Sequence, residues 1–205
     1  MTNRMSANTA PLTTRILRVY DNSTDAMRIA GELWYQEANE ECRTLALEFG
    51  IRHAQAIGIV AALSPNMRWE RNVLAAREML QGNMRVTYPA NVGKACGILA
   101  DRDPMDVLGG NKVRSFYQNI LSGGYDEAVT VDGHASNIAR GIRQPIARTT
   151  VTNRQYGIIA RAYRNAATRR NLTPPAMQAT VWLAWRASED RVDNRMPLDI
   201  RYTFA

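Results

Sequence analysis

The sequence predicts an all-α protein, because apolar residues recur at helical spacing and strand signals are almost absent. Most apolar positions follow the three- and four-residue spacing of an amphipathic helix. Residues that begin or end helices interrupt this pattern at short intervals. Only residues 129–131 have the character of an extended segment. We therefore expect about ten short helices joined by short loops.

Capping residues mark the ends of these helices. The expected helices cover residues 14–20, 23–38, 40–49, 52–63, 64–80, 90–100, 104–108, 112–121, 132–141, 153–169 and 174–187. Ser23 or Thr24 can accept a hydrogen bond from a first helical turn. Gly50 can adopt the left-handed conformation that ends a helix. Ser64 followed by Pro65 fits an N-cap with proline at the first helical position.

Composition places the chain among ordinary globular proteins. Hydrophobic residues make up 45% and charged residues 22% of the 205 residues, enough to bury a core without disulfides or metals. Only Cys42 and Cys96 are cysteines, which excludes a disulfide framework and a four-thiolate metal site. No apolar run reaches the ~18 residues of a membrane span, and the N-terminus lacks the apolar core of a signal peptide. We expect a cytoplasmic monomer without membrane contact, in the host cytoplasm if the source is viral. We also expect a tail and entry segment over residues 1–22, followed by one helical domain over 23–205.

Positive charge is concentrated in one stretch of the chain. Residues 133–188 contain nine arginines and no Asp or Glu. These arginines are Arg140, Arg143, Arg148, Arg154, Arg161, Arg164, Arg169, Arg170 and Arg186. The stretch predicts contact with a polyanion such as nucleic acid; the alternative is a solvated basic face that meets acids from the N-terminal half. On the first interpretation, neutralising Arg140 or Arg143 should weaken DNA binding, whereas neutralising Arg28 should not.

Residues 104–122 predict a helical hairpin, and the loop over 123–134 that follows it carries an aspartate. Gly109 and Gly110 allow a tight turn between two short helices, so that backbone N–H groups at a helix start can bind a phosphate. A Gly-Gly turn alone is more often only a turn. Here Lys112 follows the turn, and Asp132 follows an apolar triplet.

These motifs resemble those of the helix-hairpin-helix DNA glycosylase superfamily. Gly110-Asn111-Lys112-Val113 resembles the end of the family's hairpin, where lyase-competent members place a nucleophilic lysine. Val129-Thr130-Val131-Asp132-Gly133-His134 resembles the stretch that carries the catalytic carboxylate. Ala62-Leu63-Ser64-Pro65-Asn66 resembles a helix-end motif whose polar side chain enters the duplex, here Asn66. The resemblance implies a helix-hairpin-helix glycosylase-like fold, two small helical lobes flanking a cleft, in which DNA contacts Gly109, Gly110, Asn111 and Val113.

The implied activity is that of a DNA glycosylase, an enzyme of base excision repair. Such an enzyme flips a damaged or modified nucleotide and acts at its N-glycosidic bond, with lyase activity where a lysine is the nucleophile. The sequence departs from the family in a shorter hairpin turn and in Gly133, where Thr or Val is usual. Two other functions stay open: a phage enzyme of the same fold that builds hypermodified thymines, and a non-catalytic DNA-binding protein.

The two central residues each have two interpretations. A carboxylate at the sugar can stabilise the positive charge that develops as the N-glycosidic bond breaks, or deprotonate the nucleophile; Asp132 is equally suited to cap a helix. Lys112 can attack C1′ as a partly neutral amine and form a Schiff base, or it can bind a phosphate.

Nearby aromatic and histidine side chains complete the candidate site. Trp69, three residues after Asn66, can stack on a base or pack in the core, and Tyr117 can line a pocket. His134 can contact DNA phosphate or pack in the first turn of its helix. Two histidines without Cys or carboxylate partners predict no metal site, and no cofactor is expected.

Overall fold

The computed structural model describes residues 8–192, with side chains to residue 188, and this part of the chain is all-helical. Its helices are α1 (Ala10–Asp21), α2 (Asp25–Phe49), α3 (His53–Leu63), α4 (Trp69–Leu80), α5 (Pro89–Leu99), α6 (Pro104–Val107), α7 (Asn111–Leu121), α8 (Gly133–Arg140), the 3₁₀ helix η1 (Ile146–Arg148), α9 (Asn153–Thr168) and α10 (Pro174–Val192). No β-strand occurs between residues 8 and 192. The predicted all-α class is confirmed.

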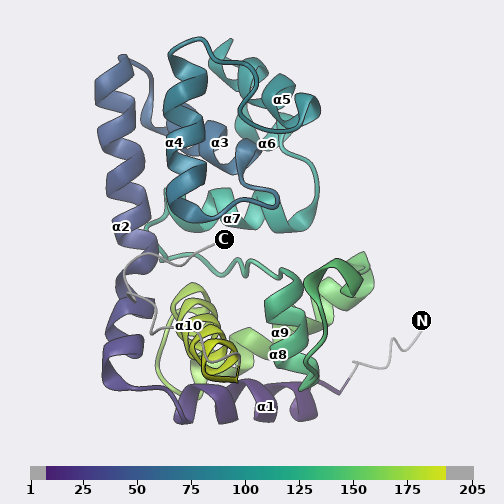
Figure 1. Ribbon diagram of the computed structural model, residues 1–205. Helices are drawn as coiled ribbons and strands as arrows, with labels where there is room; N and C mark the ends of the chain where they lie inside the picture. The colour runs from purple at the N-terminus through teal and green to yellow at the C-terminus, as the bar shows by residue number, and fades with distance from the viewer. Residues whose placement is uncertain (1–7, 193–205) are drawn as a thin grey trace, which may run out of the picture.

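The helices form two groups, each around its own hydrophobic core (Figure 1). One core joins α3, α4, α5 and α7 to residues 34–46 of α2. The other joins α1, α8, α9 and α10 to the extended residues 129–131. Helix α2 runs along both groups, and the 122–131 segment passes between them (Figure 1). The region between the cores is therefore bordered by both groups of helices.

A close crossing of α2 and α10 holds the two groups together. A Cβ atom built on Gly31 of α2 would lie 2.2 Å from Thr180 Oγ1 and 2.6 Å from Thr180 Cα on α10. Real side chains do not approach so closely, so only glycine permits this contact. Met27 of α2 packs beside the same crossing with Trp182 and Leu183.

Three boundaries differ from the sequence-based expectation. The helices expected over 23–38 and 40–49 are one helix, α2, because the buried stripe continues from Ala38 to Cys42 with no glycine or proline between them. The helix expected over 14–20 within the entry segment begins earlier, at Ala10, and forms α1, whose Ile16 is fully buried in the second core.

The third difference lies at Ser64, which ends α3 instead of starting the next helix. Its hydroxyl donates a hydrogen bond to the Ala61 carbonyl oxygen (2.9 Å). Residue Asn66 then takes a left-handed conformation (φ 63°), which asparagine tolerates better than most residues. Helix α4 begins only at Trp69.

No single described helix is both long and apolar enough to cross a membrane. Only α2 and α3 together meet that criterion, and the chain bends by 112° between them.

Candidate functional site

A pocket opens between the two cores and takes residues from both. It contains a cavity of about 60 Å³. Its lining residues are Trp34, Tyr35, Ser64, Met67, Trp69, Asn72, Lys112, Phe116, Thr130, Asp132, Gln178 and Trp182. Lys112 and Asp132, which the sequence singled out from separate motifs, therefore line the same pocket.

Aromatic rings form one wall of the pocket. Trp34 meets Trp69 edge-on, with ring centroids 5.3 Å apart, and stacks on Phe116 at 6.0 Å. The Trp69 indole N–H donates to Glu41 Oε2 (2.9 Å), which fixes the orientation of its ring. Aromatic faces arranged in this way offer stacking surfaces to a planar group.

Lys112 reaches the pocket from the first turn of α7. Gly110 precedes this helix with φ 76°, a conformation that glycine adopts without strain. No side chain caps α7, so the N–H groups of its first turn remain available to a ligand. The second lysine of the chain lies beside the same turn: a Cβ atom on Gly109 would be 3.6 Å from Lys94 Nζ. Both lysines of the chain thus lie at the turn between α6 and α7.

Asp132 caps α8 and still faces the pocket. Its Oδ1 accepts a hydrogen bond from the Ala135 backbone N–H (2.7 Å), so the capping interpretation is correct for this oxygen. Its other carboxylate oxygen has no hydrogen-bond partner among the described residues. Since Asp132 lines the pocket, one carboxylate oxygen is available there while the other holds the helix start.

Tyr156 of α9 holds the extended segment that leads to Asp132. Its hydroxyl lies 2.6 Å from the Val129 carbonyl oxygen and accepts a hydrogen bond from the Val131 N–H (3.3 Å). Burial raises the pKa of Tyr156, and the negative charge of Asp132 adds to the increase. Ser115 Oγ of α7 lies 3.0 Å from the same hydroxyl. One tyrosine therefore connects α7, α9 and the segment that positions Asp132.

A buried chain of polar groups forms the floor of the pocket. The Asn119 amide donates to Thr130 Oγ1 (3.1 Å), and the Tyr35 hydroxyl lies 3.2 Å from Thr130 Oγ1 and 3.1 Å from Gln178 Oε1. Burial raises the pKa of Tyr35 to about 12, so its hydroxyl keeps its proton at neutral pH. Because the Gln178 oxygen can only accept, the single Tyr35 hydrogen is donated to Gln178, and the Thr130 hydroxyl supplies its own hydrogen to Tyr35.

The remaining predicted site residues lie in different places. Asn66 is exposed, between Ser64 and Met67 of the pocket rim. Val113 packs its side chain against the first core, which leaves only its backbone for a ligand. Tyr117 is buried in that core and does not line the pocket; the adjacent residue Phe116 does, so this prediction was wrong by one helical position.

Asn111 and His134 each contact a neighbouring helix. The Asn111 amide donates to Asn153 Oδ1 (3.3 Å) at the start of α9, which brings the first turns of α7 and α9 side by side. His134 packs edge-on against Trp182 of the pocket, with ring centroids 6.0 Å apart.

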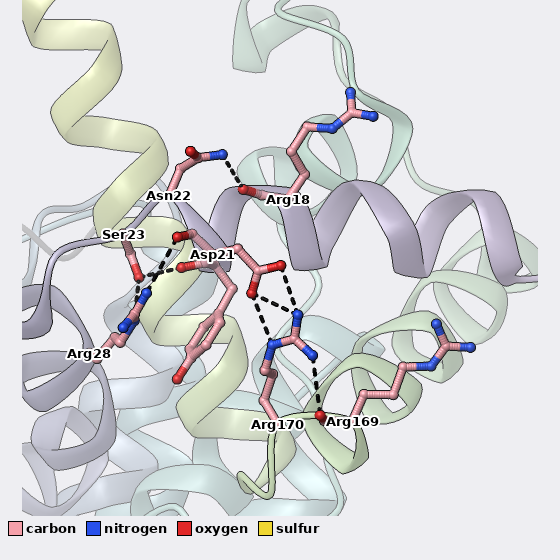
Figure 2. Close-up of polar contacts among 8 residues, drawn as sticks. Arg18, Asp21, Asn22, Ser23, Arg28, Arg169 and Arg170 are labelled. Atoms are coloured by element: carbon pink, nitrogen blue, oxygen red, sulfur yellow. Dashed lines mark hydrogen bonds and ion pairs between the residues drawn. The ribbon is translucent and has the colours of Figure 1, made fainter.

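The arginines of the acid-free stretch fall into two sets. Arg170 forms a bidentate ion pair with Asp21, at 2.7 and 2.8 Å (Figure 2). Arg143 lies over the Trp185 ring at 3.9 Å. Of the nine arginines of this stretch, Arg140, Arg148, Arg154 and Arg169 form no side-chain ion pair or hydrogen bond within residues 8–188. The alternative of a basic face that meets N-terminal acids therefore holds for Arg170, while the second set is available to a polyanion.

Sequence reasoning missed several residues of the pocket. Trp34, Phe116 and Gln178 line it from three helices, and Lys94 lies at the α6–α7 turn. Asn72 of α4 is only 1% exposed, lines the pocket, and has no hydrogen-bond partner for its Oδ1. The available signal was a polar residue on an apolar helix face, since Asn72 stands three residues after Trp69 and three before Ala75.

Within residues 8–188, no group of three or more His, Cys, Asp or Glu side chains could hold a metal ion.

Comparison with known proteins defines the family of the chain. No curated protein and no solved structure matches the chain. A family model matches residues 1–189, and the chain therefore belongs to DUF7178, a family of unknown function.

Proposed function

We propose that this protein is a helix-hairpin-helix DNA glycosylase that flips a damaged or modified nucleotide and acts at its N-glycosidic bond. The observation that carries the proposal is the meeting of Lys112 and Asp132 in one aromatic-walled pocket between two helical groups. The two residues come from separate motifs, and nothing in a structural role for either requires them to share a cavity.

Asp132 is assigned to the sugar of the flipped nucleotide. Cleavage of the N-glycosidic bond leaves positive charge on the sugar, which a fixed carboxylate stabilises. The Ala135 N–H holds one Asp132 oxygen in place, so the other is presented to the pocket at little entropic cost. Such preorganisation is the usual source of electrostatic catalysis.

Lys112 is assigned to C1′ of the same sugar. Its neutral amine forms a bond to C1′ as the bond from C1′ to the base breaks, and the base leaves with the electron pair and takes a proton. Loss of an amine proton and opening of the sugar then give a Schiff base, from which strand cleavage follows. Lys112 lies in the first turn of α7, beside the N–H groups assigned to the DNA backbone.

The DNA backbone is assigned to the two adjacent helix starts. Uncapped N–H groups of α7 bind phosphate, and Arg154 in the first turn of α9 lies beside them through the contact from Asn111 to Asn153. Lys94 adds a third positive group at the α6–α7 turn. Lys112 of the same α7 turn lines the pocket, so we assign these groups to the strand from which a nucleotide is turned inward.

The proposal is tested by release of free base from duplexes that each carry one modified base. Wild type is expected to release a base from at least one duplex, and Asp132→Asn, which retains a capping side chain, is expected to lose this activity by about 10²-fold or more. Lys112→Arg keeps the positive charge but cannot form a Schiff base, so it is expected to lose strand cleavage and retain duplex binding. If wild type binds these duplexes and releases nothing, or if Asp132→Asn is fully active, the glycosylase proposal fails and a DNA-binding module without chemistry is favoured.

A further inference from the structure

Asn72 presents an unpaired carboxamide to the pocket. The residue is 1% exposed, and its Oδ1 has no partner among the described residues. Its Nδ2 has none either, since no hydrogen bond or unprinted contact involves it within this part of the chain. Buried polar groups are rarely left without partners. A carboxamide of this kind in a pocket wall indicates a ligand that both donates to it and accepts from it.

Gln178 of α10 presents a second amide group to the same pocket. Its Oε1 accepts the Tyr35 hydrogen (3.1 Å), and this contact orients the amide so that oxygen faces Tyr35. Its Nε2 has no hydrogen-bond partner among the described residues and remains a donor. Asn72 comes from α4 beside the first core and Gln178 from α10, so a single ligand can bridge the two helical groups.

The unpaired neutral groups of the pocket have a defined hydrogen-bonding character. Asn72 supplies one acceptor oxygen and one NH2 donor group, and Gln178 supplies a further NH2 donor group; pairing once with each group is the simplest match. A complementary ligand edge has one N–H donor and two acceptors. The Watson–Crick edges of thymine, uracil and cytosine have this composition, whereas guanine has two donors and one acceptor, and adenine has one of each. Aromatic rings at Trp34, Trp69 and Phe116 provide the stacking surface that such a ring needs.

We infer that Asn72 and Gln178 read the Watson–Crick edge of a pyrimidine, and that Asn72 determines the specificity of the site. The inference rests on the proposed function for the presence of a nucleotide in the pocket, and it adds the class of base. Lys112 and Asp132 are left for the sugar, because a neutral pyrimidine edge needs no charged partner.

Nucleoside binding to the full chain tests the inference without requiring any reaction. Trp34, Trp69 and Trp182 line the pocket, so their fluorescence reports a ring that stacks beside them. Thymidine or deoxycytidine is expected to bind at least about tenfold more tightly than deoxyguanosine, and 3-methylthymidine, which lacks the N–H, at least about tenfold more weakly than thymidine. Equal binding of all four nucleosides, equal binding of the methylated probe, or no binding at millimolar concentration would overturn the inference.

Substitution of Asn72 separates recognition from a structural role. Asn72→Leu keeps the number and branching of side-chain heavy atoms and has no unpaired polar group, so it is expected to leave the melting temperature unchanged or raise it, while binding of thymidine falls to that of 3-methylthymidine. Asn137 is the matched control, since it is equally buried but has hydrogen bonds to Gln144 and Thr149; Asn137→Leu is expected to lower the melting temperature. A large loss of stability in Asn72→Leu would make the residue structural, and Asn72→Ala then measures binding in a chain with less steric change.

The inference and the proposed function fail in different assays. Pyrimidine-selective nucleoside binding without base release would keep the inference and refute the glycosylase. Base release that Asn72→Leu performs with unchanged substrate preference would keep the glycosylase and refute the inference.

Discussion

Gly31→Ala perturbs the crossing of α2 and α10, on which the geometry of the pocket depends. The added methyl group would lie 2.2 Å from Thr180 Oγ1 and 2.6 Å from the Thr180 backbone N and Cα atoms. Rotation of a side chain cannot relieve a clash with backbone atoms, so the two helices must move apart. Overpacking of this kind costs about 1–3 kcal/mol, and the higher helix propensity of alanine returns up to about 1 kcal/mol.

The expected net loss is about 1 kcal/mol of unfolding free energy, equivalent to a fall of about 2–4 °C in Tm for a chain of this size. Thermal and urea unfolding followed by circular dichroism measure it. Gly157→Ala is the matched control, because Gly157 lies inside α9 with no atom within 4 Å of an added Cβ; this variant is expected to gain up to about 1 kcal/mol. Equal or greater stability of Gly31→Ala relative to wild type would refute the packing argument.

Three further predictions concern the Asp132 helix cap, the buried Cys42 thiol and the arginines proposed to bind DNA. Asp132→Ala is expected to lower stability by about 1 kcal/mol through loss of the α8 cap, while Asp132→Asn remains near wild type in Tm, and both lose base release. Burial raises the pKa of the Cys42 thiol from its ordinary 9.0 to about 12, so the unfolded chain releases this proton at lower pH than the folded chain. The free energy of unfolding should therefore fall between about pH 9 and 12, by up to about 1.4 kcal/mol per pH unit for this group. The fall should be less steep in Cys42→Ala. Arg154→Gln should weaken duplex binding and reduce the salt slope by about 1, whereas Arg170→Gln, whose guanidinium is bound by Asp21, should leave both unchanged.

Local signals in the sequence were sufficient for the parts of the site that depend on local backbone geometry. Gly110 and Asp132 occupy helix starts because their own conformations suit those positions. Their spacing along the chain and the lysine between them were visible without a structure. What brings Lys112 and Asp132 to one pocket is the packing of α7 against the extended segment through Tyr156, a contact between residues distant in sequence.

The roles of residues that depend on packing against another helix could not be assigned from the sequence. Phe116 and Tyr117 are adjacent, both aromatic, and differ by 100° around α7, so helix phase alone decides which one meets the pocket. Asn72 lies within a helix of ordinary amphipathic pattern, and its unpaired carboxamide acquires a role only when Gln178 and the aromatic wall are placed around the same space. Ser64 carried the local signal of an N-cap, but the chain turns at Asn66 before α4 begins.

In the basic stretch, too, the charge can be read from the sequence, whereas the ion-pair partners depend on tertiary packing. The absence of acids over residues 133–188 predicts a polyanion-binding surface, yet Figure 2 shows Arg170 bound to Asp21, whereas Arg18 and Arg169 extend away from that cluster. Charge counted along the chain therefore overestimates the number of arginines available to a polyanion, and among them Arg170 is already paired with Asp21.

The most direct measurement for the proposed site is covalent trapping on a duplex that contains an abasic site, which requires no knowledge of the base. Borohydride reduction is expected to trap the wild-type chain through Lys112, identified by mass spectrometry of the peptide adduct. Lys112→Arg should give no adduct, and Lys94→Arg, which changes the neighbouring lysine at the same turn, should give as much as wild type. Absence of an adduct on the wild-type chain, or an adduct on another amine that persists in Lys112→Arg, would contradict the assignment of Lys112 to C1′.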